Sequence, residues 1–112
     1  MTIRAEFLRL VNMRPEAIRA WARDPRAHCY SQLATIRRLP KLAALRRRAA
    51  RVGYLPTPAE VRYMRKVVGF IKRHKAQVRT QGCTEGRAVA LRNWGHAACA
   101  VPATCTRARR KR

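Results

Sequence analysis

Acidic residues are scarce in this chain of 112 residues, with five Asp and Glu against 27 Lys and Arg. So few carboxylates leave little for general acid–base catalysis, and no nucleophile lies beside an obvious base. With only five glycines, the chain also lacks a Gly-rich loop that could hold phosphates. We therefore do not expect an enzyme, and we expect no cofactor.

Long apolar runs are absent as well. No stretch approaches the roughly 20 apolar residues of a membrane-spanning helix, and the first residues lack the apolar run of a secretory signal. The Arg-rich start is similar to a mitochondrial presequence, but Glu6, Glu16 and Asp24 argue against that assignment. We expect no membrane partner and an intracellular, reducing compartment such as a nucleoid, nucleus or virion, with an organelle as the alternative.

The chain has four cysteines, and in a reducing compartment we expect Cys29, Cys83, Cys99 and Cys105 to be free thiols. Together with His96, the last three offer metal-ligand atoms, but neither the Cys-x-x-Cys nor the His-x₃₋₅-His spacing of zinc sites occurs. The spacing therefore predicts no metal site, although the residue types leave open whether these side chains ever bind metal.

The chain does contain helical periodicity, and no alternating strand pattern accompanies it. Thr57, Pro58 and Glu60 form the clearest local signal, a capping box with proline at the first helical position. We predict an all-α protein of about five short helices over residues 1–96, followed by a flexible, disordered basic tail over residues 97–112. The predicted helical stretches are 3–11, 15–23, 31–39, 41–52, 58–78 and 85–94, with Ser31 as a candidate cap, a break or kink at Pro40 and a buried stripe that ends at Val52.

Basic side chains gather on one face of the longest predicted helix, 58–79, when it is wound at 100° per residue. Apolar side chains such as Val67 and Ile71 cover the other face, and Gly69 lies among the cations, where its small size would let a phosphate approach closely. A basic stripe is usually a solvated face, but here no acids alternate with the bases. Arginine predominates among these cations, and its planar guanidinium binds phosphate through two parallel hydrogen bonds. The candidate phosphate-binding residues are Arg37, Arg38, Arg46, Arg47, Arg48, Arg51, Arg62, Arg65, Lys66, Lys72, Arg73, Arg107, Arg109, Arg110, Lys111 and Arg112.

The formal net charge of +22 opposes folding unless a polyanion neutralises part of it. Nucleic acid is the expected partner, and the favoured function is sequence-tolerant binding or packaging of duplex DNA. The first alternative is a structural RNA-binding subunit of a ribosome or other ribonucleoprotein, including an organellar one. The second is an interaction module for an acidic protein partner. The sequence distinguishes neither DNA from RNA nor one oligomeric state from another.

Three segments carry distinct motifs that occur in a fixed order: residues 11–16 (VNMRPE), 63–77 (YMRKVVGFIKRHKAQ) and 91–96 (LRNWGH). In this order they resemble an uncharacterised family of small bacterial proteins, a domain of unknown function sometimes labelled DNA-binding. Its members carry an "NMTP" turn, a central "MRKVVGYVHRHLAQ" helix and a closing "NWGH". The resemblance implies a small helical domain in which His74 and residues 93–96 contribute to packing or to a site, and it implies no activity. This chain departs from the family by having basic or neutral residues where members carry acids.

Overall fold

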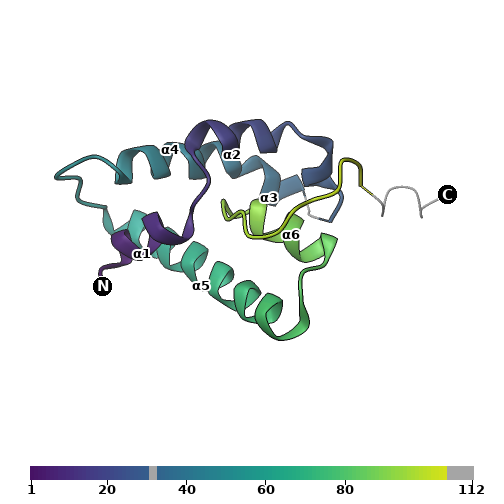
Figure 1. Ribbon diagram of the computed structural model, residues 1–112. Coiled ribbons are helices and arrows are strands. Elements are labelled where there is room, and N and C mark those ends of the chain that lie inside the picture. The colour runs from purple at the N-terminus through teal and green to yellow at the C-terminus, as the bar shows by residue number, and fades with distance from the viewer. Residues whose placement is uncertain (31–32, 106–112) are drawn as a thin grey trace.

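The computed structural model describes residues 1–30 and 33–105, and it shows helices and no strand in those ranges. The predicted all-α fold is confirmed, while the candidate cap Ser31 lies outside the described residues. None of the helices in the described ranges is long and apolar enough to cross a membrane. The elements are α1 (Ile3–Leu10), α2 (Pro15–Ala22), the short 3-10 helix η1 (Pro25–His28), α3 (Leu33–Arg37), α4 (Leu39–Ala49), α5 (Pro58–Gln81) and α6 (Glu85–Arg92) (Figure 1).

The helices pack in two groups that enclose the core. Helix α2 packs along α4, and α1 packs against α5 (Figure 1). Helix α6 contacts both α5 and η1, and the segment that follows it passes between the two groups. The longest helix, α5, has 24 residues, which corresponds to about 36 Å at 1.5 Å per residue. It is therefore the most extended straight element available to a ligand.

One apolar core joins these helices. Its fully buried side chains include Phe7, Ile18, Leu42, Met64 and Leu91, which come from α1, α2, α4, α5 and α6. Burying a side chain of this size stabilises the folded state by about 1.5–3 kcal/mol relative to leaving it exposed. These positions recur at helical spacing, and the periodicity of the sequence is therefore a sound guide to the core.

The boundaries around α4 differ from the prediction. Helix α4 begins at Leu39 and carries Pro40 in its first turn, where a proline loses no intrahelical hydrogen bond. The predicted division into two helices is present, but it falls at Arg38, and Pro40 opens the second helix. The expectation that Val52 belongs to the buried stripe is wrong, because the helix ends at Ala49 and the Val52 side chain is fully exposed.

The start of α5 follows the prediction. Thr57 Oγ1 accepts a hydrogen bond from the Glu60 amide at 3.1 Å, and the Glu60 carboxylate accepts one from the Thr57 amide at 2.9 Å. Pro58 occupies the first turn, where no amide donor is needed. The capping box fixes where α5 begins, and the helix then continues to Gln81, beyond the predicted end at residue 78.

Residues 93–96, directly after α6, are buried and connect distant parts of the chain. Trp21 Nε1 donates a hydrogen bond to Asn93 Oδ1 at 2.6 Å, and Asn93 Nδ2 donates to the Ala27 carbonyl at 3.1 Å. One amide side chain thus holds α2, η1 and the end of α6 together.

Gly95 and His96 complete this closure. Gly95 has a φ of 85°, and a Cβ added there would lie 2.8 Å from Val11 Cγ1, so only glycine fits. His96 Nδ1 lies 2.6 Å from the Leu10 carbonyl oxygen, which requires that this nitrogen carry the hydrogen. Burial lowers the pKa of His96, which favours the neutral form of the ring.

The segment after His96 is held against the helices. Asn12 Nδ2 donates to the Ala97 carbonyl at 3.0 Å, and Asn12 Oδ1 accepts from the Ala97 amide at 2.8 Å. Arg26 Nη1 donates to the Pro102 carbonyl at 3.1 Å. Contacts with the helical body therefore continue beyond residue 96, where we placed the start of the tail. Residues 106–112 of that tail lie outside the described residues.

The four cysteines form two disulfides, Cys29–Cys105 and Cys83–Cys99, with Cα–Cα distances of 6.1 and 6.4 Å. The expectation of free thiols is therefore wrong. Each disulfide joins the C-terminal segment to an earlier part of the chain, at the turn after η1 and at the loop between α5 and α6. The partners are 76 and 16 residues apart, separations that carry no short-range spacing signal.

Replacing Asn93 by Ala removes the hydrogen bonds to Trp21 and to the Ala27 carbonyl. Trp21 Nε1 and the Ala27 carbonyl then lose their partner away from water, and each such group costs about 1–3 kcal/mol. We expect the free energy of unfolding to fall by about 2–4 kcal/mol, measured by urea denaturation followed through Trp fluorescence. Asn12→Ala is the matched control, because Asn12 also joins two distant segments through two hydrogen bonds but is exposed. Equal losses in the two variants would contradict the importance assigned to burial.

Candidate nucleic-acid interface

The exposed face of α5 carries four cations with no acid beside them. Arg62, Arg65, Lys66 and Arg73 are exposed, and within the described chain their side chains make no ion pair or hydrogen bond. Lys72, the fifth candidate on this helix, lies 2.5 Å from the Glu6 carboxylate of α1. The structure thus places the α5 candidates on the solvent side of the helix and neutralises one of them.

The opposite side of α5 holds this face in place. Met64, Val67 and Ile71 are buried in the core, so the helix cannot rotate about its axis without exposing them. Arg62 and Arg73 are separated by about 16 Å along the helix at 1.5 Å per residue. At about 3.4 Å of duplex length per phosphate on one strand, that distance covers roughly five phosphates. The face is therefore a rigid row of cations on the scale of a nucleic-acid backbone.

Gly69 is covered by a neighbouring side chain. A Cβ added at Gly69 would lie 3.3 Å from Arg73 Nη1, so the Arg73 guanidinium folds back over this position. The sequence suggests that Gly69 lets a phosphate approach the helix backbone, but that approach requires Arg73 to swing away. The guanidinium itself remains exposed and can meet a phosphate directly.

His74 belongs to an aromatic stack and does not join the cation face. Its ring stacks on Phe70 with 3.9 Å between centroids, and Phe70 stacks on Trp94 at 4.6 Å. His74 Nδ1 lies 3.1 Å from the Phe70 carbonyl oxygen, one turn earlier in the helix. The stack couples α5 to the buried residues after α6, which is a packing role.

A second group of exposed cations lies on α3, α4 and the turn after α4. Arg37, Arg38, Arg47 and Arg51 are all exposed. Arg47 Nη2 lies 3.5 Å from Glu16 Oε1, and both side chains are more than half exposed, so this pair contributes little. These four cations therefore remain available to a ligand.

A groove lies between α4 and the first half of α5. It encloses a cavity of about 170 Å³, and Lys41 Nζ lies 5.5 Å from the centroid of the Tyr63 ring across it. None of the exposed α5 cations lines it. The lining residues are Lys41, Leu45, Arg48, Ala59, Glu60 and Tyr63.

Arg46, another candidate, points inward and forms a reciprocal arrangement with Arg4. Arg46 Nε donates to the Val11 carbonyl at 2.9 Å, at the C-terminus of α1. Arg4 Nε donates to the Ala49 carbonyl at 2.8 Å, at the C-terminus of α4, and Arg4 Nη2 donates to the Arg51 carbonyl at 2.9 Å. Each guanidinium thus caps the helix that carries the other, where carbonyls lack intrahelical partners and the helix dipole favours a cation. Burial lowers the pKa of Arg46.

Arg48 is also engaged within the protein. Its Nη2 lies 2.9 Å from Glu60 Oε2, and the Tyr54 hydroxyl donates to Glu60 Oε1. Hydrogen bonds from the Tyr54 hydroxyl, the Thr57 amide and Arg48 lower the pKa of Glu60 to about 2. The Arg48 charge is therefore balanced by an ionised carboxylate, unlike the charges on α5.

The tail candidates lie outside the described residues: Arg107, Arg109, Arg110, Lys111 and Arg112. The chain that leads to them passes through Cys105, whose disulfide to Cys29 fixes that point next to η1. The tail therefore starts from a fixed position on the body.

A third group of exposed cations, which was not among the candidates expected from the sequence, lies at α2. Arg14, Arg19 and Arg23 are exposed. Arg19 and Arg23 are four residues apart, a spacing that places them on one helix face and that is visible in the sequence. Positive charge therefore covers more than one surface, and α5 stands out as the helix with the longest row of cations.

Comparisons with protein-family models, with curated proteins and with solved structures find no match. The function proposed below therefore rests on the surfaces just described.

Replacing Arg46 by Lys keeps the positive charge but removes the fork of guanidinium donors that caps α1. Lys presents a compact ammonium that cannot reproduce this geometry, so we expect the free energy of unfolding to fall by about 1–3 kcal/mol. Arg47→Lys, one position along on the exposed surface, should change it by less than about 0.5 kcal/mol. Thermal and urea denaturation of both variants measure the difference. A destabilised Arg47→Lys beside an unchanged Arg46→Lys would refute the capping role.

Glu60→Gln tests the carboxylate at the start of α5. The pKa of Glu60 is lowered from 4.5 to about 2 in the folded protein, so the charged form stabilises the fold above pH 4.5 and this contribution disappears as the pH falls toward 2. We expect the variant to be less stable at pH 7 by about 1–2 kcal/mol, a value reduced for partial exposure. The difference in melting temperature between the wild type and the variant should become smaller below pH 4.5. Glu16→Gln, at the exposed 3.5 Å pair, should show no such difference, and a pH-independent Glu60→Gln effect would argue against the charge.

Proposed function

We propose that this protein binds nucleic acid through the phosphates, without reading base sequence, and that duplex DNA is its favoured ligand. The observation that carries the proposal is the α5 face, where Arg62, Arg65, Lys66 and Arg73 are exposed with no carboxylate beside them in the described chain. Cations fixed in this way bind a polyanion chiefly by releasing its counterions.

The balance of charge over the whole chain supports a polyanionic ligand. Even if each of the five acids neutralised one cation, 22 positive charges would remain, which is the formal net charge. Such a surplus repels itself in the free protein. A polyanion that binds the folded form removes this repulsion and stabilises the fold by mass action.

The shape of α5 favours a duplex. The helix is a straight rod of 24 residues, and a duplex offers two rows of phosphates beside a major groove about 12 Å wide that admits an α-helix. Arg and Lys on such a rod reach phosphates whatever the base sequence, and phosphate contacts fix position without specifying bases. Folded RNA and acidic proteins also present negative charge, and the binding experiment below distinguishes them.

The two disulfides favour one of the expected cellular locations over the others. Disulfides persist in oxidising surroundings and on virions, and they are rare in the cytosol. Of the compartments considered from the sequence, a virion suits both two disulfides and a role in DNA packaging. We therefore favour that location over a nucleoid or nucleus.

Removing three cations from α5 should weaken binding and its salt dependence together. If the protein makes about six to eight phosphate contacts, log K falls with log salt at a slope of roughly −5 to −7. In the combined variant Arg62→Gln, Arg65→Gln and Arg73→Gln, we expect the slope to become shallower by about 2–3, because each lost contact removes about 0.9. Fluorescence anisotropy with a labelled 20-base-pair duplex at several salt concentrations measures both quantities.

The matched control removes the same charge from α2, through Arg14→Gln, Arg19→Gln and Arg23→Gln. We expect a smaller change in slope, because these cations lie on a different helix. Equal effects of the two triple variants would refute α5 as the interface, because binding would then depend only on the overall charge of the protein. Structured RNA or polyglutamate that competes better than duplex at matched salt would replace the proposed ligand. An absence of binding near physiological salt would refute nucleic-acid binding altogether.

A further inference from the structure

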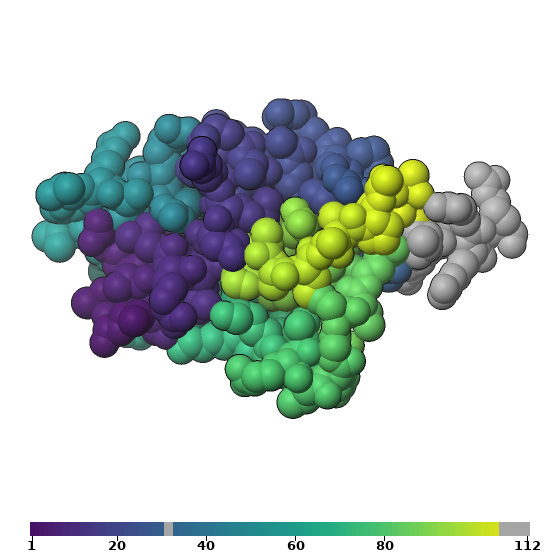
Figure 2. Space-filling view, viewed as in Figure 1, coloured from purple at the N-terminus to yellow at the C-terminus, as the bar shows by residue number. Residues whose placement is uncertain are grey.

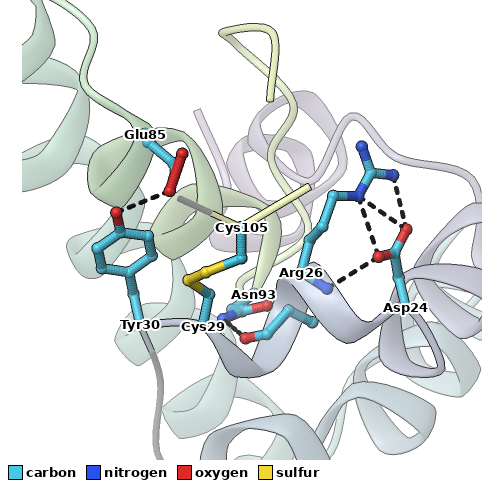
Figure 3. Close-up of a disulfide and its surroundings, with 8 residues drawn as sticks. Asp24, Arg26, Cys29, Tyr30, Glu85, Asn93 and Cys105 are labelled. Atoms are coloured by element: carbon cyan, nitrogen blue, oxygen red, sulfur yellow. Dashed lines mark hydrogen bonds and ion pairs between the residues drawn. A yellow bond between two sulfur atoms is a disulfide. The ribbon is translucent and has the colours of Figure 1, made fainter. Parts of the chain in front are cut away.

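A cysteine pair and a carboxylate come together at one end of the molecule. Cys29 lies in the turn after η1, Cys105 lies at the end of the described C-terminal segment, and Glu85 lies in the first turn of α6. Their Sγ and carboxylate oxygen atoms all lie within 4.8 Å of one another. Figure 3 shows the Glu85 side chain beside the Cys29–Cys105 disulfide. Two sulfurs and one carboxylate oxygen from three distant segments form the one such ligand cluster found in the described chain.

We propose that, when this disulfide is reduced, Cys29, Cys105 and Glu85 bind a zinc ion. A phosphine supplies two electrons, and one water molecule supplies the two thiol protons and the oxygen of the phosphine oxide that leaves. With a thiol reductant, two reductant thiols supply the electrons and the protons and leave as their own disulfide. Zn²⁺ then displaces both thiol protons and forms two Zn–S bonds, while Glu85 donates a carboxylate oxygen. The proposal is independent of nucleic-acid binding.

The geometry allows this exchange without a large backbone movement. Zinc binds thiolates at about 2.3 Å in a tetrahedral arrangement, which places two such sulfurs about 3.7 Å apart. The Cα atoms of Cys29 and Cys105 are 6.1 Å apart, and rotation of the two side chains opens the sulfurs to that separation. The Glu85 oxygen is already within 4.8 Å of both.

Tyr30 orients the carboxylate ligand. The Tyr30 hydroxyl donates a hydrogen bond to Glu85 Oε2 at 2.8 Å (Figure 3). Carboxylates that bind metals are commonly held by a second group in this way, which fixes the orientation of the ligand. The chain thus provides a supporting contact as well as the three ligands.

The net charge at the site is the same in both forms. Arg26 lines the same crevice as Cys29, Glu85 and Cys105, but its guanidinium lies 2.6 Å from the Asp24 carboxylate, which balances its charge. Two thiolates, one carboxylate and Zn²⁺ sum to −1, which is also the charge of the disulfide with ionised Glu85. Either form therefore leaves the electrostatics of the basic surfaces unchanged.

A fourth ligand has room to approach. A second cavity, of about 520 Å³, is lined by Cys29 and Cys105 together with His28 and Thr104. A water molecule from this cavity would complete a tetrahedral site with three protein ligands. Sulfur ligands select zinc over magnesium or calcium, which prefer oxygen. The metal would hold the C-terminal segment in place under reducing conditions, as the disulfide does under oxidising ones.

The test uses the full chain, reduced with a phosphine, desalted without oxygen and titrated with Co²⁺ as a spectroscopic probe and then with Zn²⁺. We expect one Co²⁺ per chain, a thiolate-to-cobalt charge-transfer band in the near ultraviolet, and displacement by Zn²⁺. The oxidised protein should show no band. Cys83→Ser combined with Cys99→Ser, which removes the other disulfide, should keep the band, whereas Cys29→Ser combined with Cys105→Ser should lose it. Glu85→Gln should weaken Zn²⁺ binding at least about ten-fold.

If reduction unfolds part of the chain, helicity measured by circular dichroism still tests the proposal. In the variant that lacks Cys83 and Cys99, Zn²⁺ must then restore helicity, and in the variant that lacks Cys29 and Cys105 it must not. A reduced wild type that binds no Co²⁺ would overturn the proposal. A band that survives the loss of Cys29 and Cys105 would also overturn it.

Discussion

Five carboxylates have to serve a chain that carries 27 cations, and this shortage shapes the contacts between helices. Glu6 joins α1 to α5 through Lys72, and Glu60 joins α5 to α4 through Arg48. Elsewhere backbone carbonyls accept the guanidinium hydrogen bonds that carboxylates would otherwise accept. Arg4 and Arg46 each cap the helix that carries the other. Unpaired carbonyls at the helix ends thus accept hydrogen bonds from arginines for which no carboxylate is present.

Contacts of this kind leave most of the positive charge unbalanced, and covalent links offset the repulsion. In the chain-entropy model, disulfides that close loops of 76 and 16 residues destabilise the unfolded chain by about 4–5 and about 3 kcal/mol. Both links involve the C-terminal segment, which has no helix of its own in its described part. The Arg26 and Arg92 side chains add hydrogen bonds to the carbonyls of Pro102 and Cys99. Residues 97–105, which carry no charged side chain, are thereby held against the helical body (Figure 2).

The sequence predicts the elements of this fold better than its long-range links. Helical periodicity and the capping box at Thr57 identify α5, because both are local signals. Four cysteines allow three pairings, and no spacing rule selects one, so the disulfides follow only from the three-dimensional fold. For the same reason the sequence cannot separate Arg46 from Arg47. Both lie in one basic run, and only the nearby end of α1 turns Arg46 inward. The periodicity also misplaced Val52, because it does not reveal where α4 ends.

The arginines therefore fall into two populations, those that the fold satisfies and those that it leaves exposed. Arg4 and Arg46 are explained by the fold, because carbonyls satisfy them. The fold does not explain Arg62, Arg65 and Arg73, which contact no acid or carbonyl in the described chain and are exposed on a helix whose other side is fixed by the core. Keeping like charges in a row on a rigid helix opposes folding. Binding of a polyanion would remove that repulsion, which is the physical basis for proposing a phosphate backbone as the ligand.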